Sequence, residues 1–252
     1  MPKNHSQHLT ILTGASRGMG LAMAEQLLQA GHRLVCISRQ TNQQLAANYG
    51  EMLEQWQHDL GDAAPVAARL GQWLQQQDAA QWASVTLINN AGILARLTPL
   101  RDAEAVDLAQ ALRVGLEAPM QLTAAFLDAT RRWPGQRRVL NISSGLGRRA
   151  MAASAAYCAA KAGMDHFSRC VALDEAPQPN GAKICSLAPG VIDTDMQAQL
   201  RGADSAAFAD QEAFANLHRS GQLTSPSDAA ARVLAYLAQP DFGSQPVADV
   251  RG

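Results

Sequence analysis

The sequence lacks an excess of charge of either sign. Its 21 Lys and Arg residues nearly balance 22 Asp and Glu residues, which leaves a formal net charge of -1 and a pI near 6.6. A chain with this balance has no global basic field for nucleic acid. The arginine pairs at 131–132, 137–138 and 148–149 are too short to form a basic tract, and we expect them on the solvated surface. We therefore expect no nucleic-acid partner.

Long apolar runs and secretory features are also missing. No run approaches the roughly 18 apolar residues that a membrane helix needs, and the first residues, MPKNHSQH, do not resemble a signal peptide. The four cysteines show no metal-ligand spacing and lie in apolar segments, which is typical of core-packing thiols in a reducing compartment. We therefore expect a cytoplasmic protein with no membrane partner and no metal site.

Short apolar runs alternate with longer amphipathic runs along the 252 residues. Near-continuous apolar strands that alternate with helices indicate a parallel sheet covered on both faces. No repeat or linker interrupts the pattern, so we assign one α/β domain to residues 1–252. The predicted strands are 9–14, 33–39, 54–60, 84–92, 137–144, 182–190 and 245–252, and the predicted helices are 18–31, about 62–77, 102–132, 154–176 and 226–239.

Two segments between or within these elements have distinctive features. Residues 191–224 are the least regular part of the chain, and an insertion of this length is often a substrate lid. The helix at 226–239 is well marked, because Ser225 can cap it and Pro226 suits its first position.

A glycine-rich turn, TGASRGMG at 13–20, lies between the first predicted strand and its helix. Its three glycines allow a sharp turn, and the helix N-terminus offers N–H groups and a positive dipole end to a pyrophosphate. Such a turn can also serve packing alone. Its place in a strand–turn–helix–strand unit favours nucleotide binding.

The end of the second predicted strand, VCISRQ, carries no carboxylate. In NAD-binding proteins an acidic residue usually lies there and binds the ribose 2′-hydroxyl. Here Ser38 and Arg39 occupy that place, and Arg17 adds a guanidinium in the glycine turn. Two arginines suit a 2′-phosphate, although both can also be ordinary surface residues. We therefore predict NADP(H) as the cofactor.

Tyr157 and Lys161, in YCAAK, fall one turn apart on one face of a predicted helix. A tyrosine has an ordinary pKa of about 10, and a neighbouring ammonium lowers it by stabilising the phenolate. The pair alone would be commonplace. Ser144, in NISSGLG, lies upstream at the end of a predicted strand. The three side chains together predict an acid–base site.

Together these motifs resemble the short-chain dehydrogenase/reductase family. The resemblance implies a single doubly wound Rossmann-type domain with seven parallel strands in the order 3-2-1-4-5-6-7. It also implies an oxidoreductase that forms a homodimer or homotetramer through the helices at 102–132 and 154–176. The matching segments, in the family's order, are TGASRGMG, HDL (58–60), NNAG (89–92), NISS (141–144), YCAAK (157–161) and APGVIDT (188–194).

The resemblance also implies roles for individual residues. Ser144 would hold a substrate carbonyl, Tyr157 would donate the proton, and Lys161 would lower the pKa of the tyrosine and bind the nicotinamide ribose. Ser144 is preferred to Ser143 because of its offset from Tyr157. The residues predicted to contact NADP(H) are Gly14, Ser16, Arg17, Gly18, Met19, Gly20, Arg39, Asp59, Leu60, Asn90, Ala91, Gly92, Tyr157, Lys161, Pro189, Gly190, Ile192 and Thr194.

A narrower likeness concerns APGVIDTDMQ at 188–197, which resembles sepiapterin reductases and the related benzil reductases. Those enzymes reduce ketones or vicinal dicarbonyls with NADPH. We therefore predict an NADPH-dependent reductase of a small-molecule carbonyl substrate. A 3-oxoacyl thioester reductase of the same family and a catalytically idle NADP(H)-binding sensor are the alternatives.

The segment RVGLEAPM, at 113–120, departs from the family pattern, which has an asparagine where this chain has Gly115. Pro119 lacks an N–H and crowds the carbonyl four residues back, which is that of Gly115. That carbonyl then needs another partner. In the family it would hold a water linked to Lys161, so Gly115 stays a candidate catalytic residue and Gly115→Asn should be tolerated. The alternative is a kink that only bends the helix.

Overall fold

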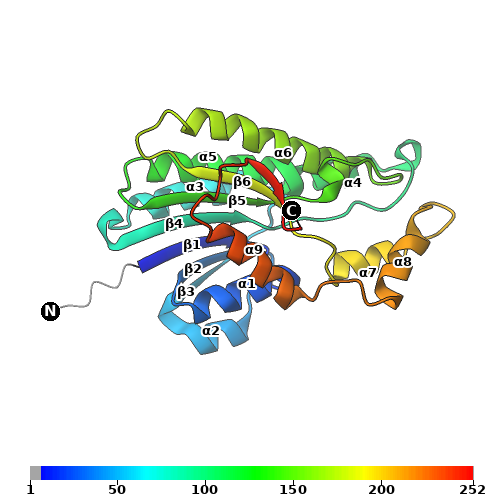
Figure 1. Ribbon diagram of the computed structural model, residues 1–252, viewed down its shortest axis with the longest axis horizontal. Helices are drawn as coiled ribbons and strands as arrows, with labels where there is room; N and C mark the ends of the chain where they lie inside the picture. Colours follow the sequence, from blue (N-terminus) through cyan, green and yellow to red (C-terminus); the bar gives the residue numbers. More distant parts are fainter. Residues whose placement is uncertain (1–6, 252) are drawn as a thin grey trace.

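Seven parallel strands form one sheet in the computed structural model, which describes residues 7–251 (Figure 1). The order β3-β2-β1-β4-β5-β6-β7 confirms the predicted topology. The direction of strand order reverses between β1 and β4, where doubly wound sheets bind ligands. The strands are β1 (Gln7–Thr13), β2 (Arg33–Ser38), β3 (Leu53–Gln57), β4 (Trp82–Asn89), β5 (Gln136–Ile142), β6 (Lys183–Ala188) and β7 (Val247–Asp249).

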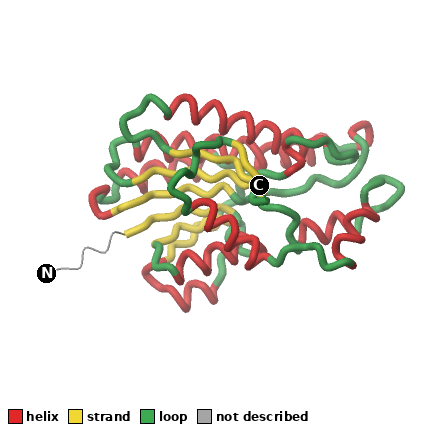
Figure 2. Tube along the Cα trace, in the orientation of Figure 1, coloured by secondary structure: helices red, strands yellow, loops and turns green. Residues whose placement is uncertain are grey.

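Helices cover both faces of this sheet, which Figure 2 shows as one layer between two groups of helices. One face packs against α3, α5 and α6, and the other packs against α1 and α9. The helices are α1 (Gly18–Gln29), α2 (Gln43–Tyr49), α3 (Ala64–Gln75), α4 (Ala105–Leu112), α5 (Ala118–Thr130), α6 (Ala155–Glu175), α7 (Asp195–Arg201), α8 (Gln211–Arg219) and α9 (Pro226–Leu237).

Alternation along the strands builds two cores, because successive side chains of a strand point to opposite faces. Ile11 packs in the core beneath α3 and α5, whereas Leu12 packs in the core beneath α1 and α9. A third, smaller cluster around Met151, Leu200 and Phe208 lies outside the sheet. Within residues 7–251, no helix combines the length and the apolar character that crossing a membrane requires.

Several predicted boundaries are corrected by the structure. The strand predicted at 54–60 ends at Gln57, so Asp59 follows the strand instead of belonging to it. Helix α2 was not predicted, and it begins where the Asn42 side chain accepts a hydrogen bond from the Leu45 N–H at 3.0 Å. The predicted cap of α9 is confirmed, because Ser225 accepts from the Asp228 N–H at 3.0 Å. Residues 1–6 and the last residue of the predicted strand at 245–252 lie outside the described residues.

The helix predicted at 102–132 is divided by a π-helical turn, Arg113–Glu117, between α4 and α5. The Ala118 N–H donates to the Arg113 carbonyl, five residues back. Pro119 thereby falls in the first turn of α5, where no helical N–H is needed. The glycine and proline therefore mark a π turn, a feature that often lies at functional sites.

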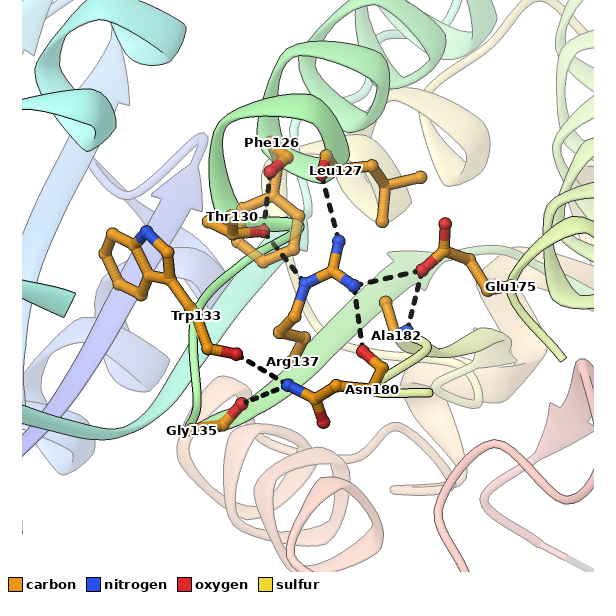
Figure 3. A network of polar contacts seen from close by, with 9 residues as sticks. All are labelled: Phe126, Leu127, Thr130, Trp133, Gly135, Arg137, Glu175, Asn180 and Ala182. Carbon is orange, nitrogen blue, oxygen red and sulfur yellow. Dashed lines mark hydrogen bonds and ion pairs between the residues drawn. The ribbon is translucent and has the colours of Figure 1, made fainter. Parts of the chain in front are cut away.

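Arg137 is buried, against the expectation that its arginine pair is solvated (Figure 3). Its guanidinium donates to the Thr130 hydroxyl, to the carbonyls of Leu127 and Asn180, and to Glu175 at 3.2 Å. Burial lowers the pKa of Arg137, and Glu175 opposes that shift. The network ties α5 and the end of α6 to the start of β5.

The cysteines are all free thiols, but they do not all pack in the core as predicted. Cys36 and Cys185 are buried, and burial raises their pKa values to about 12 and about 11. Cys170 is exposed on α6. The prediction from apolar neighbours in the sequence is therefore correct for Cys36 and Cys185. It is wrong for Cys170, which lies on the outer face of a helix.

Candidate active site

A cavity of about 1580 Å³ lies at the carboxyl ends of β1, β2, β4, β5 and β6. Every predicted catalytic and cofactor-binding residue except Gly115 lines it. These residues come from positions 14 to 194, so the fold gathers motifs that lie far apart in the chain. Sequence reasoning missed Gln110, Phe214 and Arg251 on the same wall, since none of them belongs to a motif.

The glycine turn is held by hydrogen bonds from the strand ends. The Ala15 N–H donates to the Ser38 hydroxyl at 2.8 Å, so Ser38 fastens the turn to the end of β2. Gly14 has a φ of +69°, and a Cβ at Gly20 would lie 2.0 Å from the Gly14 carbonyl oxygen. The first turn of α1 contains no acidic residue, so its N-terminal N–H groups and positive dipole end remain available to an anion.

Asn90 supports the turn from the other side. Its amide donates to the carbonyls of Thr13 and Gly14 at 3.0 and 3.1 Å. The Thr13 hydroxyl in turn accepts from the N–H groups of Asn90 and Ala91 at 2.9 and 3.0 Å. These bonds join β1 to β4 at the point where the strand order reverses, and they fix the floor of the cavity.

The two arginines predicted near a 2′-phosphate differ in their surroundings. Arg17 forms an ion pair with Asp195 at 2.9 Å, which links the glycine turn to α7, and both side chains are about 70% exposed. Arg39 is exposed on the cavity wall and has no ion-pair partner among residues 7–251. Arg39 is therefore the freer of the two guanidinium groups for an anion.

Ser144, Tyr157 and Lys161 lie together at the end of β5. The Ser144 hydroxyl oxygen accepts from the Leu146 N–H at 3.2 Å, and the same side chain interacts with Tyr157. Lys161 is buried, donates to the Ile142 carbonyl at 2.7 Å, and has its Nζ 5.7 Å from the Tyr157 ring centre. Ser143 points elsewhere, because its hydroxyl donates to Asp165.

The pKa shifts of the pair differ from the sequence prediction. Burial raises the pKa of Tyr157, and a side-chain interaction with Ser144 opposes that rise. Burial also lowers the pKa of Lys161 to about 8, and Asp165 opposes that shift. The predicted lowering by Lys161 therefore does not produce a net lowering of the Tyr157 pKa here, because burial disfavours the charged form of both groups.

Gly115 lies behind the cavity wall, in the π turn that packs on α6. A Cβ built there would lie 3.0 Å from the Cβ of Ala160, the residue before Lys161. Gly115→Asn is therefore tolerated only if Ala160 can shift by a few tenths of an ångström, and its tolerance stays a prediction. The partner of the Gly115 carbonyl stays a prediction.

The other end of the cavity has an apolar wall. Leu94, Leu146, Leu200 and Phe214 line the cavity and also belong to the third hydrophobic cluster. Within the segment predicted as a lid, α7 and α8 are joined by a bond at 3.1 Å from the Gln197 amide to the carbonyl of Phe214. The helices project beyond the carboxyl ends of the strands (Figure 1).

Comparisons with known proteins show what this chain is similar to. The model of the short chain dehydrogenase family matches residues 8–205. An (S)-benzoin-forming benzil reductase from Bacillus cereus is 35% identical over 235 residues, 92% of this chain and 94% of that protein. Sepiapterin reductase from Xenopus tropicalis is 31% identical over 207 residues, 77% of each chain. A short-chain dehydrogenase/reductase structure from Burkholderia vietnamiensis matches with a TM-score of 0.67 and 34% identity, covering 98% of both chains.

Proposed function

Because the chain belongs to the short-chain dehydrogenase family and is an oxidoreductase, we propose that it reduces a ketone or vicinal dicarbonyl with NADPH. The observation that carries the proposal is the convergence of Ser144, Tyr157 and Lys161 on the cavity that the glycine turn also lines. An acid–base pair and a dinucleotide turn in one cavity suit hydride transfer coupled to proton transfer.

The residues at the other strand ends fit a dinucleotide. The free N-terminal end of α1 suits a pyrophosphate, and the unpaired Arg39 beyond β2 suits a 2′-phosphate. NADPH held by these residues would supply a hydride to the carbonyl carbon. The residues of the loop after β6 also line the cavity, where they would bound the nicotinamide: Pro189, Gly190, Ile192 and Thr194.

The side chains of the catalytic set divide the work on the carbonyl oxygen. Ser144 and Tyr157 both line the cavity, so the Ser144 hydroxyl would donate to the oxygen of a carbonyl bound between them. Tyr157 then gives its proton to the developing alkoxide. With a pKa of about 8, Lys161 is mostly an ammonium at pH 7, so its charge stabilises the tyrosinate that remains.

The substrate end of the cavity favours an apolar or aromatic carbonyl compound. Its leucines and Phe214 offer apolar contacts, while Ser144 and Tyr157 address a single oxygen. The similarity to a benzil reductase supports an aromatic 1,2-diketone as the first compound to assay.

The absence of a side chain at Gly115 favours one second candidate, an NADP(H)-binding protein with little turnover. The two functions are separated by following NADPH consumption with aromatic 1,2-diketones, pterin side-chain ketones, quinones and 3-oxoacyl thioesters. Steady turnover with a carbonyl compound supports the reductase. Tight NADPH binding without turnover of any of them contradicts it.

We also propose that the protein forms a homodimer or homotetramer through α4, α5 and α6. Large apolar side chains are exposed on these helices, including Val106 on α4, Met120 on α5 and Leu173 on α6. Burial of these side chains against a second subunit would remove their apolar area from water. Light scattering after size exclusion measures the mass, and a monomer of 26.8 kDa at all concentrations would contradict the proposal.

A further inference from the structure

Helix α6 carries a buried carboxylate that the mechanism above does not use. Asp165 is 2% exposed, one turn beyond Lys161 and two turns beyond Tyr157. Its Oδ1 accepts hydrogen bonds from the hydroxyls of Ser143 at 2.5 Å and Ser186 at 2.7 Å. One oxygen therefore ties α6 to the segment after β5 and to β6.

The second oxygen of Asp165 is buried without a hydrogen-bond partner among residues 7–251. The Arg148 Nε is 3.8 Å away, and that side chain is 37% exposed. A Cβ at Gly147 would lie 2.8 Å from this oxygen, so the glycine lets the turn Gly145–Gly147 close over the carboxylate. Burying a carboxylate is costly in free energy unless its charge is paired and hydrogen-bonded. Nearby cations must therefore compensate the negative charge of Asp165.

We infer that Asp165 is a positioning residue, which holds the strand end carrying Ser144 against the helix carrying Tyr157 and Lys161 and provides the counter-charge of the Lys161 ammonium. The inference deepens the proposed function and rests on it. Asp165 itself does not line the cavity, so it acts through Ser143 on the neighbouring Ser144, and through the field of its charge on Lys161.

The counter-charge role of Asp165 follows from the surroundings of Lys161. Burial lowers the pKa of Lys161 to about 8, and the charge of Asp165 works against that lowering. The other ionisable groups around the pair are Tyr157 on α6, Arg148 after the turn, and Cys185 on β6. Removing the carboxylate charge leaves the burial effect unopposed, so the pKa of Lys161 falls further and the ammonium is lost at a lower pH.

Asp165→Asn separates charge from geometry, because the amide oxygen can still accept from both serine hydroxyls. The matched control is Asp174→Asn, which removes an exposed charge from the same helix. The chain has three lysines, Lys3, Lys161 and Lys183, so protein labelled with ¹³C at lysine Cε gives few NMR signals to titrate. Lys161→Met assigns the Lys161 signal.

We expect Asp165→Asn to lower the Lys161 titration by about one pH unit, a tenfold change in the ratio of neutral to charged form. Lys183 should not move, and Asp174→Asn should leave Lys161 unchanged. The alkaline limb of kcat for carbonyl reduction should shift in the same direction. An unchanged Lys161 titration in folded Asp165→Asn, or an equal shift in the control, overturns the counter-charge role. The NMR readout needs no substrate, so it remains decisive even if no carbonyl is reduced.

Ser143→Ala tests the positioning role and stands in if Asp165→Asn does not fold. It removes one of the two hydroxyl donors to Asp165 and keeps the charge of the carboxylate. We expect kcat to fall about tenfold because Ser144 is held less precisely, which corresponds to about 1.4 kcal/mol of lost transition-state stabilisation, with the Lys161 titration unchanged. A kcat within about twofold of the wild type overturns the positioning role.

Discussion

The two ends of the sheet bury charge in different ways. At the amino end of β5, the Arg137 guanidinium has acceptors from α5, from the segment after α6 and from Glu175 (Figure 3). At the carboxyl end, Asp165 keeps one oxygen unbonded and Lys161 has a pKa lowered to about 8. The fully hydrogen-bonded Arg137 network stabilises the fold. The charges of Asp165 and Lys161 are only partly paired and lie beside a cavity, so they remain sensitive to a bound ligand.

The largest effect is expected at the carboxyl end, from Tyr157→Phe. The ring still fills its buried place, but no proton reaches the alkoxide, so kcat should fall about 10³-fold. NADPH titration followed by fluorescence should give an unchanged Kd, and thermal unfolding should differ little. Near wild-type turnover would show that Tyr157 is not the acid.

Arg137→Met should disrupt the hydrogen-bond network at the amino end of β5 without changing catalysis. It leaves Glu175 without its cationic partner and the carbonyls of Leu127 and Asn180 without the Arg137 donor, and breaking a buried pair costs about 3 kcal/mol of unfolding free energy. Urea unfolding measures this loss, with the exposed Arg131→Met as control. At a temperature where the variant is folded, KM for the carbonyl should not change. A loss of kcat in that folded state would contradict the division between the two ends.

Arg39→Asp should sharpen the assignment of the cofactor half of the cavity. Replacing the unpaired guanidinium by a carboxylate removes a partner of the 2′-phosphate and repels it, so the ratio of kcat/KM for NADPH over NADH should fall about 100-fold. Arg17→Asp should have a smaller effect, because Arg17 is paired with Asp195. A wild-type enzyme that prefers NADH would refute the assignment.

The smallest effect concerns the packing of the π turn on α6. Gly115→Asn places a Cβ 3.0 Å from Ala160, which should cost about 1–2 kcal/mol of unfolding free energy. The double variant with Ala160→Gly should recover the part of this loss that comes from the clash. Equal unfolding free energies for the wild type and Gly115→Asn would show that the helices move apart freely.

The glycine turn, Ser144, Tyr157 and Lys161 could be predicted because each belongs to a local pattern with its own chemistry. The alternation of elements predicted a covered parallel sheet, and its strand order came from the family resemblance alone. The π turn could not be placed, since Gly115 and Pro119 are compatible with both a kink and a changed hydrogen-bond register. Phe214 and Arg251 could not be predicted as cavity-lining residues, because no short sequence pattern relates them to the motifs.

By itself, the sequence determined all seven strands, most of the helices, and which motif residues stand at the carboxyl ends of the strands, because apolar periodicity and turn residues act locally. Only the tertiary structure decided the surroundings of the charges. Arg137 and Arg138 are neighbours in an arginine pair, yet only Arg137 is buried. The sequence did not mark Asp165 as special, but packing brings Ser143 and Ser186 to one of its oxygens and leaves the other without a donor. Burial and field strength depend on what packs against a side chain, and those partners come from distant parts of the chain.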